Sequence, residues 1–257
     1  MTAAARYPDL SGKVVLVTGA STGIGLGIAH GVLQAGGSVC VCARQQARLA
    51  AAAEGLRAVS DRLLVIPGDV TDETVIDGIV SSCIERFGRI DGCVANAGID
   101  SVTPLHEMSL TEWRRVLGGN LDSAFLAARA FVRALLALET GGSFVAVSSV
   151  AARRGRVGRA HYVAAKAGLV ALTRSLAVEY GGLGIRANVV MPGSVETDMA
   201  RDAPDWEAIR SRVASRTPLG RPGQVAELAG IVVYLLSDLS TFHTGDVISV
   251  DGGMSAT

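Results

Sequence analysis

Short apolar runs alternate with longer, helix-period segments along most of the chain. Valine-, isoleucine- and leucine-rich runs predict strands, and the amphipathic segments between them predict helices. We expect seven strands, at residues 13–18, 38–43, 63–66, 90–94, 143–147, 185–190 and 247–250. The helices expected between them cover residues 26–34, 72–87, 110–138, 162–180 and 224–236. Such alternation indicates an α/β fold with a doubly wound parallel sheet.

Composition bounds the class of protein. No linker or change in composition marks a second domain, so we expect one domain over residues 1–257, with a loose tail at 1–11. The hydrophobic content of 49% suits a parallel sheet buried on both faces and a large subunit interface, and we expect no membrane-spanning segment. Twenty-four basic residues balance 24 acidic ones, so there is no electrostatic case for binding nucleic acid or an anionic membrane.

Neither the four cysteines nor the four histidines have the spacing of a metal site, and we expect no metal. Cys40 and Cys42 alternate along a predicted strand and so face the same way, whereas Cys83 and Cys93 fall in separate elements. The chain starts without a signal peptide. We therefore expect reduced thiols in a cytoplasmic protein.

A glycine-rich turn joins the first predicted strand to the first predicted helix. Its pattern is G-x-x-x-G-x-G, which differs from the commonest dinucleotide fingerprint. Glycines let backbone N–H groups approach a pyrophosphate, and the helix that follows presents its positive end to it. A strand, turn and helix in this order favour a nucleotide site over a mere tight turn. The expected contacts are Gly19, Ser21, Thr22, Gly23, Ile24 and Gly25.

The end of the second predicted strand discriminates between two cofactors. An NAD site needs a carboxylate here to bind the ribose 2′-hydroxyl, but Ala43 takes that place and Arg44 follows. A guanidinium beside the ribose suits a 2′-phosphate. We therefore expect NADP(H) in preference to NAD(H). The alternative is that Arg44 only solvates the end of the strand.

Residues with special chemistry or backbone freedom follow six of the predicted strands. In a doubly wound sheet, ligands bind outside the carboxyl ends of the strands. These residues are therefore expected to converge on one crevice: Gly19, Arg44, Asp69, Asn96, Ser149 and Pro192.

Tyr162 and Lys166 stand four residues apart in a predicted helix, on one face and one turn apart. A tyrosine with a pKa of roughly 10 is a poor acid–base catalyst at neutral pH. A cation held one turn away favours the phenolate and is expected to lower the pKa of Tyr162. Alone, this spacing is more often a packed tyrosine and a solvated lysine. The surrounding motifs reverse that balance.

Together these motifs resemble those of the short-chain dehydrogenases/reductases in their single-domain form. The match runs from about residue 10 to residue 254, in the family's order and spacing. It comprises the glycine turn after Thr18, Asn96-Ala97-Gly98, Ser149, Tyr162 with Lys166, and Pro192-Gly193 followed by Thr197. One departure is Ala95, where the family usually has asparagine. The resemblance implies a Rossmann-type doubly wound, seven-stranded parallel sheet with helices on both faces. It also implies a homotetramer formed through residues 110–138, 162–180 and the last strand.

The resemblance also implies a role for each motif residue. Tyr162 is expected to act as the general acid in carbonyl reduction or the base in alcohol oxidation, and Lys166 to hold the nicotinamide ribose. Ser149, rather than Ser148, is expected to hydrogen-bond the substrate oxygen. Asn120 is expected to hold a water that links Lys166 to solvent. Further implied cofactor contacts are Asp69 and Val70 at the adenine, Asn96, Ala97 and Gly98 along the cofactor, Val195 and Thr197 at the carboxamide, and Pro192 and Gly193.

Four arginines lie between Ser149 and Tyr162, in a loop that borders the substrate pocket in this family: Arg153, Arg154, Arg156 and Arg159. Our hypothesis is that at least one faces an anionic group of the substrate. The expected substrate contacts are Ser149, Ala151 and Arg159. The alternative is a solvated or subunit-contacting loop. Residues 194–222 are expected to form a lid over the substrate.

The expected function is that of an NADP(H)-dependent oxidoreductase that interconverts a ketone or β-ketoacyl group and a secondary alcohol by hydride transfer. Its partner is a small carbonyl or alcohol substrate. One alternative is an NAD-dependent secondary-alcohol dehydrogenase. A second is a non-catalytic dinucleotide-binding protein, against which the intact Asn120, Ser149, Tyr162 and Lys166 set argues. The resemblance extends to 3-oxoacyl-[acyl-carrier-protein] reductases, although residues 138–142 lack the basic side chains that an acidic carrier favours.

Overall fold

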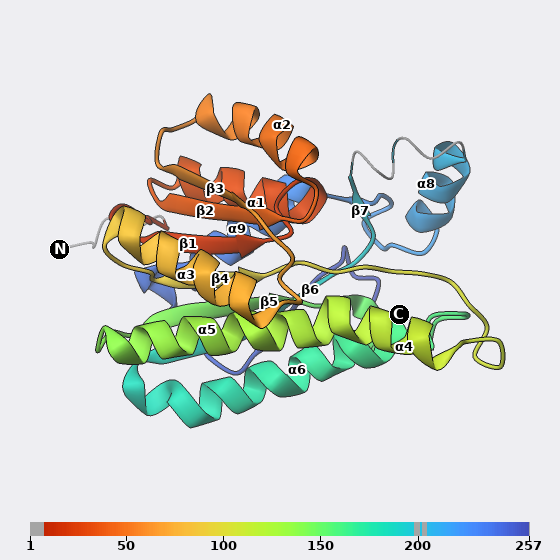
Figure 1. Ribbon diagram of the computed structural model, residues 1–257. Helices are drawn as coiled ribbons and strands as arrows, with labels where there is room; N and C mark the ends of the chain where they lie inside the picture. Colours follow the sequence, from red (N-terminus) through yellow and green to blue (C-terminus); the bar gives the residue numbers. More distant parts are fainter. Residues whose placement is uncertain (1–7, 198–200, 202–204, 257) are drawn as a thin grey trace.

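A single parallel sheet organises the structure, a computed structural model that describes residues 8–197, 201 and 205–256 (Figure 1). Seven strands form the sheet in the order β3-β2-β1-β4-β5-β6-β9, and every neighbouring pair is parallel. This confirms the predicted doubly wound sheet. The strands are β1 (Val14–Thr18), β2 (Ser38–Ala43), β3 (Leu63–Pro67), β4 (Gly92–Ala95), β5 (Gly142–Val147), β6 (Ile185–Pro192) and β9 (Val247–Val250). The order reverses between β1 and β4, where a doubly wound sheet leaves a crevice at its carboxyl edge.

Helices cover both faces of the sheet (Figure 1). One layer contains α1 (Gly23–Gln34), α2 (Gln46–Arg57) and α9 (Val225–Leu236), and the other contains α3 (Glu73–Phe87), α5 (Ser123–Ala137) and α6 (Ala160–Tyr180). Along β1, Val15 and Val17 pack against the first layer, whereas Val14 and Leu16 pack against the second. Because both faces are covered, the strands read as continuous apolar runs rather than alternating ones.

Local sequence explains how closely the elements pack. A Cβ at Gly27 would lie 1.9 Å from Val225 Cγ1, and one at Gly31 would lie 3.0 Å from Ala229 Cβ, so two glycines one turn apart let α1 approach α9. At the start of α3, Asp72 Oδ1 accepts hydrogen bonds from the N–H groups of Thr74 and Val75 at 2.8 and 3.2 Å. This cap explains why the predicted boundary agrees with the observed one.

Several expectations about the elements need correction. Residues 110–138 form not one helix but α4 (Leu110–Leu117), a π-helical turn (Gly118–Asp122) and α5. The sequence pattern did not identify α2. Of the expected loose tail, residues 1–7 lie outside the described residues, but Leu10 is fully buried and its N–H donates to Ala35 O at 2.8 Å. The end of that segment is therefore packed, not loose.

The expected lid region, residues 194–222, contains β7 (Val195–Glu196) and α8 (Trp206–Ala214), while residues 198–200 and 202–204 lie outside the described part. Strand β7 pairs in parallel with β8 (Gly223–Gln224), so the two ends of this region meet in a small second sheet that the sequence did not predict. In Figure 1, α8 stands beside β7, away from the main sheet. No helix in the described part of the chain is long and apolar enough to cross a membrane.

Candidate active site

A cavity of about 620 Å³ lies at the carboxyl ends of β1, β2, β3 and β4. Most of the expected cofactor contacts line it: Gly19, Ser21, Thr22, Gly23, Ile24, Arg44, Asp69, Val70, Asn96, Ala97, Gly98 and Thr197. Gly25, Ser149, Tyr162, Lys166, Pro192, Gly193 and Val195 are not part of the lining. The structure therefore brings together, at one cavity, most of the residues that the strand ends predicted.

The glycine turn is shaped by its contact with the segment after β4. Gly19 has a φ of +66°, and a Cβ there would lie 2.7 Å from Ala97 Cα. A Cβ at Gly25 would lie 2.4 Å from Asn96 Nδ2, which itself donates to Thr18 O and Gly19 O at 3.0 and 3.1 Å. Only glycine satisfies these positions without displacing the Asn96 side chain. The turn and the Asn96-Ala97 segment thus fix each other.

The N-terminus of α1 fits an anionic group. The N-cap residue, Thr22, makes no side-chain capping hydrogen bond, and the first turn contains no acidic residue. The first backbone N–H groups of a helix lack partners within the helix and carry its positive dipole end. Here they border the cavity beside Gly23, where a Cβ would lie 3.2 Å from Thr197 Cγ2. The residues present therefore fit a dinucleotide phosphate, with Thr197 close to the turn.

Two arginines line the cavity beyond β2. Arg44 lies 3.8 Å from the carboxylate of Asp69, and both side chains are substantially exposed. Arg48, in the first turns of α2, lines the same cavity. Sequence reasoning missed Arg48, because the sequence pattern did not identify α2, the helix that carries it.

Lys166 is a buried cation on α6. Its Nζ donates a hydrogen bond to Val147 O, at the end of β5, at 3.0 Å. It also lies 5.7 Å from the centroid of the Tyr162 ring, within reach of a cation–π contact. Burial lowers the pKa of Lys166 to about 8, against an opposing contribution from Asp100. The lysine is thus poised to exchange a proton near neutral pH.

The pKa of Tyr162 is raised, not lowered as expected. Burial of the phenol is the largest cause, and the Ser149 hydroxyl opposes it. Asp100 raises this pKa further, while Arg159 and Arg156 lower it. The expectation that Lys166 lowers the pKa of Tyr162 is wrong for this structure, because the ammonium turns toward Val147 O and is itself easily deprotonated.

Asn120 occupies the π-helical turn between α4 and α5 and is fully buried. Its Nδ2 donates to Ile99 O and Val116 O at 2.7 and 2.8 Å. Its Oδ1 has no hydrogen-bond partner among the described residues. A Cβ at Gly98 would lie 2.6 Å from this Oδ1 and 3.4 Å from Lys166 Nζ, so the acceptor and the amine converge on one edge of the cofactor cavity.

The two adjacent serines at the end of β5 have different partners. Ser148 is buried, and its Oγ donates to Lys166 O at 2.7 Å, which ties the strand to α6. Ser149 Oγ accepts a hydrogen bond from Ala151 N at 3.1 Å, and a side-chain hydrogen bond with Ser149 lowers the pKa of Tyr162. Ser148 is therefore bonded to the backbone of α6, whereas the Ser149 hydroxyl faces Tyr162. Ala151 is buried beside it.

The arginine loop is held mainly by protein groups. Arg153 donates to Ser249 Oγ at 3.2 Å, Arg154 donates to Met254 O, and Arg159 forms an ion pair with Asp100. Of the four, Arg156 is the one whose side chain has no hydrogen bond or ion pair within the described part of the chain, and it still lowers the pKa of Tyr162. Arg159, the expected substrate contact, is thus already engaged by a carboxylate. This pairing with Asp100 was not predictable from the sequence.

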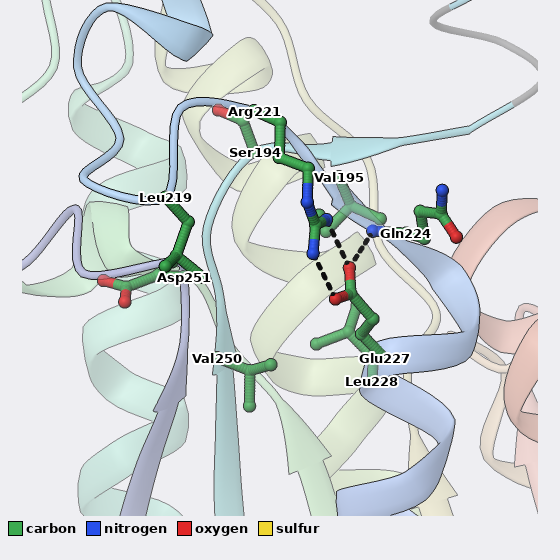
Figure 2. A pocket seen from close by; sticks show the side chains of 11 residues that line it. Ser194, Val195, Leu219, Arg221, Gln224, Glu227, Leu228, Val250 and Asp251 are labelled. Atoms are coloured by element: carbon green, nitrogen blue, oxygen red, sulfur yellow. Dashed lines mark hydrogen bonds and ion pairs between the residues drawn. The ribbon is translucent and has the colours of Figure 1, made fainter.

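A smaller cavity of about 110 Å³ lies at the base of the lid region (Figure 2). Val195 lines it, and Gly193, after the buried Pro192, packs so tightly that a Cβ would lie 2.8 Å from Asp251 Cα. Figure 2 shows Arg221 gripping the Glu227 carboxylate, with N···O distances of 2.8 and 2.7 Å. This pair fixes the end of the lid region to the start of α9.

Known proteins share both this sequence pattern and this fold. A family model described as "Enoyl-(Acyl carrier protein) reductase" matches residues 19–255. The chain is 37% identical over 246 residues to L-rhamnose 1-dehydrogenase (NAD(P)(+)) of Sphingomonas sp. (strain SKA58), which covers 95% of this chain and 97% of that one. It is also 37% identical over 246 residues to the 3-oxoacyl-[acyl-carrier-protein] reductase FabG of Escherichia coli (strain K12), with 96% and 98% covered.

Solved structures agree. A short-chain type dehydrogenase/reductase from Mycobacterium marinum superposes with a TM-score of 0.91 at 36% identity, covering 97% of this chain and 98% of the other. The chain belongs to the short-chain dehydrogenase/reductase family, oxidoreductases that act on alcohol and carbonyl groups with NAD(P). Within the described residues, no group of three or more His, Cys, Asp or Glu side chains could hold a metal ion.

Proposed function

We propose that the protein is an NADP(H)-dependent oxidoreductase that interconverts a ketone or β-ketoacyl group and a secondary alcohol, with Tyr162 as the general acid and base. One observation carries the proposal. The orphaned Asn120 Oδ1 and the buried Lys166 Nζ meet at Gly98, on the wall of the cavity that the glycine turn shapes. A protein that only bound a dinucleotide would have no need of a proton-exchanging amine and an unpaired acceptor there.

The charge around the cavity supports NADP(H). No carboxylate follows β2, where Ala43 and Arg44 stand, and Arg48 adds a second guanidinium to the same wall. Arg44 is 3.8 Å from Asp69, a distance and exposure at which the ion pair is weak. A 2′-phosphate, with more charge than one carboxylate, would compete well for Arg44.

A bound nicotinamide would supply the hydride to a carbonyl carbon or accept it from an alcohol carbon. Tyr162 would donate its proton to the carbonyl oxygen in reduction, and its raised pKa keeps the phenol protonated for this role. Ser149 Oγ–H would donate a hydrogen bond to the same oxygen. Lys166, with a pKa of about 8, would return a proton to Tyr162, and Asn120 Oδ1 would accept from the water that resupplies it.

The alternative is a secondary-alcohol dehydrogenase that works in the oxidative direction, with NAD(H) as its cofactor. The name of the Sphingomonas relative, L-rhamnose 1-dehydrogenase (NAD(P)(+)), supports it, because it names a dehydrogenase and either cofactor. The name of the Escherichia coli relative supports reduction of a β-ketoacyl group. Arg44 and Arg48 lead us to prefer NADP(H), and the unpartnered Arg156 leads us to prefer a substrate with an anionic group.

Titration with NADPH and, separately, NADH, followed by nicotinamide fluorescence, tests the cofactor assignment. We expect NADPH to bind at least tenfold more tightly, about 1.4 kcal/mol, and the preference to disappear in the Arg44→Ala, Arg48→Ala double variant. Equal binding of both cofactors by the unaltered protein would refute the preference. Tyr162→Phe should retain cofactor binding and lose turnover on ketones. Turnover by Tyr162→Phe at the normal rate would refute the catalytic assignment.

We also propose that the protein is a cytoplasmic homotetramer. On α5, Phe125 and Leu136 are 45% and 46% exposed and line a cavity of about 370 Å³, and Val178 on α6 is 87% exposed. An apolar face of this kind is typical of subunit interfaces. The four cysteines are buried and free, which is compatible with a reducing compartment.

A further inference from the structure

His161, immediately before the acid–base tyrosine, is fully buried, and both of its ring nitrogens are engaged. Its Nδ1 accepts a hydrogen bond from the backbone N–H of Tyr162 at 2.8 Å. Its Nε2 lies 3.0 Å from Ser101 Oγ, in the segment that follows β4. Nothing in the proposed chemistry uses this imidazole.

The partners of the ring determine where its proton lies. A backbone N–H can only donate, so Nδ1 must carry the lone pair and Nε2 must carry the hydrogen. Nε2–H therefore donates to Ser101 Oγ, and the Ser101 O–H donates onward to Glu112 Oε1. Glu112 is fixed by Arg115 through two hydrogen bonds of 2.7 and 2.8 Å, which hold its pKa low, at about 2. A continuous chain of donors thus runs from α6 to a permanent carboxylate on α4.

This chain supplies a cap that α6 otherwise lacks. The N-cap residue, Arg159, makes no side-chain capping hydrogen bond, so the first N–H groups of α6 depend on other partners. His161 satisfies the N–H of Tyr162 itself. The imidazole therefore fixes the backbone from which the catalytic phenol projects.

With the contact of His161, each of the three consecutive residues after β4, Ile99 to Ser101, is bonded to a side chain from another element. Asn120 Nδ2 holds Ile99 O, Arg159 holds the Asp100 carboxylate, and His161 holds Ser101 Oγ. Arg159 and His161 lie just before Tyr162 in the sequence, and Asn120 is an expected relay residue. The segment that borders the cofactor cavity is thereby locked to the acid–base residues.

We propose that His161 is a positioning residue for Tyr162: as a neutral Nε2–H imidazole, linked through Ser101 to Glu112, it holds the tyrosine backbone against the segment after β4. This inference rests on the proposed function, because it takes Tyr162 as the acid–base residue. It assigns catalytic importance to a side chain that touches neither substrate nor cofactor.

Two substitutions separate the two ends of the imidazole. His161→Asn can keep an acceptor near the Nδ1 position but cannot reach Ser101, whereas His161→Gln can reach Ser101 but offers no acceptor at Nδ1. Because misplacement of a catalytic group by about 1 Å can cost roughly 100-fold in rate, we expect kcat to fall about 10- to 100-fold in His161→Gln and several-fold less in His161→Asn. The Kd for NADPH and the KM for substrate should stay within about threefold of their original values.

The control is His106→Asn. This histidine is exposed and takes no part in the hydrogen-bond chain, so its substitution should leave kcat unchanged. Ser101→Ala, which removes only the link to Glu112, should lower kcat modestly without changing the Kd for NADPH. Equal kcat in His161→Asn and His161→Gln, unchanged kcat in both, or kcat losses that simply follow the loss of Tm in all variants would overturn the proposal.

A readout independent of turnover comes from ¹⁵N-histidine NMR of the full protein, which has four histidines. The signal that disappears in His161→Asn belongs to His161, and we expect it to show a protonated Nε2 and an unprotonated Nδ1. The opposite tautomer would overturn the hydrogen-bond chain even in an active enzyme. If the expected tautomer is found but the protein turns over no carbonyl or alcohol substrate, the hydrogen-bond chain is correct and the proposed function is wrong.

Discussion

Gly98→Ala tests the convergence of Asn120 and Lys166 directly. Gly98 does not have a left-handed backbone conformation, so alanine is sterically allowed there by its own backbone. Its new Cβ, however, would lie 2.6 Å from Asn120 Oδ1 and 3.4 Å from Lys166 Nζ. The substitution therefore crowds these two side chains without removing any functional atom.

The cost follows from how Asn120 is held. To move aside, its side chain must weaken the two Nδ2 hydrogen bonds to Ile99 O and Val116 O, at 2.7 and 2.8 Å. Two such bonds contribute roughly 1–3 kcal/mol, and overpacking a filled site costs a similar amount. We expect Tm to fall by about 2–4 °C for each kcal/mol lost and kcat to fall about 10- to 100-fold, since the displaced Asn120 Oδ1 could no longer hold its place beside Lys166.

Steady-state kinetics and thermal unfolding measure both effects. The matched control is Gly78→Ala on α3, where a new Cβ meets nothing within 4 Å and should stabilise the helix by up to about 1 kcal/mol. If Gly98→Ala kept kcat within twofold and Tm within a degree of the control, Asn120 Oδ1 and Lys166 Nζ could not both face Gly98. The relay assigned to them would then be refuted.

Three further predictions concern charge and assembly. Burial holds the pKa of Lys166 at about 8 rather than 10.5, so the charged lysine lowers the stability of the folded protein at neutral pH. In urea unfolding, the unaltered protein should therefore gain stability relative to Lys166→Met as the pH rises from 8 to 10.5. A stability difference that stays constant with pH would contradict the lowered pKa. Arg156→Ala should raise KM at least tenfold for hydroxy acids but not for neutral alcohols. Arg159→Ala should raise KM less, because the Arg159 guanidinium is already paired with Asp100. Equal effects of Arg156→Ala on both substrate classes would exclude anion recognition. Phe125→Glu combined with Val178→Glu places two carboxylates on the exposed α5/α6 face and should lower the mass of the assembly measured by light scattering. A tetramer of unchanged mass would exclude this face as the subunit interface.

The strands were predictable because both faces of the sheet are covered. Continuous apolar runs leave little choice of element, so residues 38–43 and 247–250 agree with the observed strands at both ends. The strand ends then placed Gly19, Arg44, Asp69 and Asn96 at one edge without any knowledge of side-chain contacts. Topology alone carried that part of the site.

Partnerships between distant side chains were not predictable. The spacing put Tyr162 and Lys166 on one face of a helix, but the direction of the amine depends on Val147 O in another element. Arg159 read as a free cation because its partner Asp100 lies 59 residues away. The contact between His161 and Ser101 was not predictable for the same reason, since the two residues are 60 positions apart. Local pattern specifies which residues reach a site but not which pairs form there.

The π-helical turn at Gly118–Asp122 puts α4 and α5 out of phase with each other. A π turn accommodates one residue more than an α-helical turn does, so every side chain after it is rotated by roughly 100° relative to an uninterrupted helix. Deleting one residue here would restore a regular helix, yet it would swing either Asn120 away from Ile99 or the apolar side of α5 away from the sheet. A change of length at this point is therefore more disruptive than a substitution, and it would also move Gly119, which lines the larger cavity.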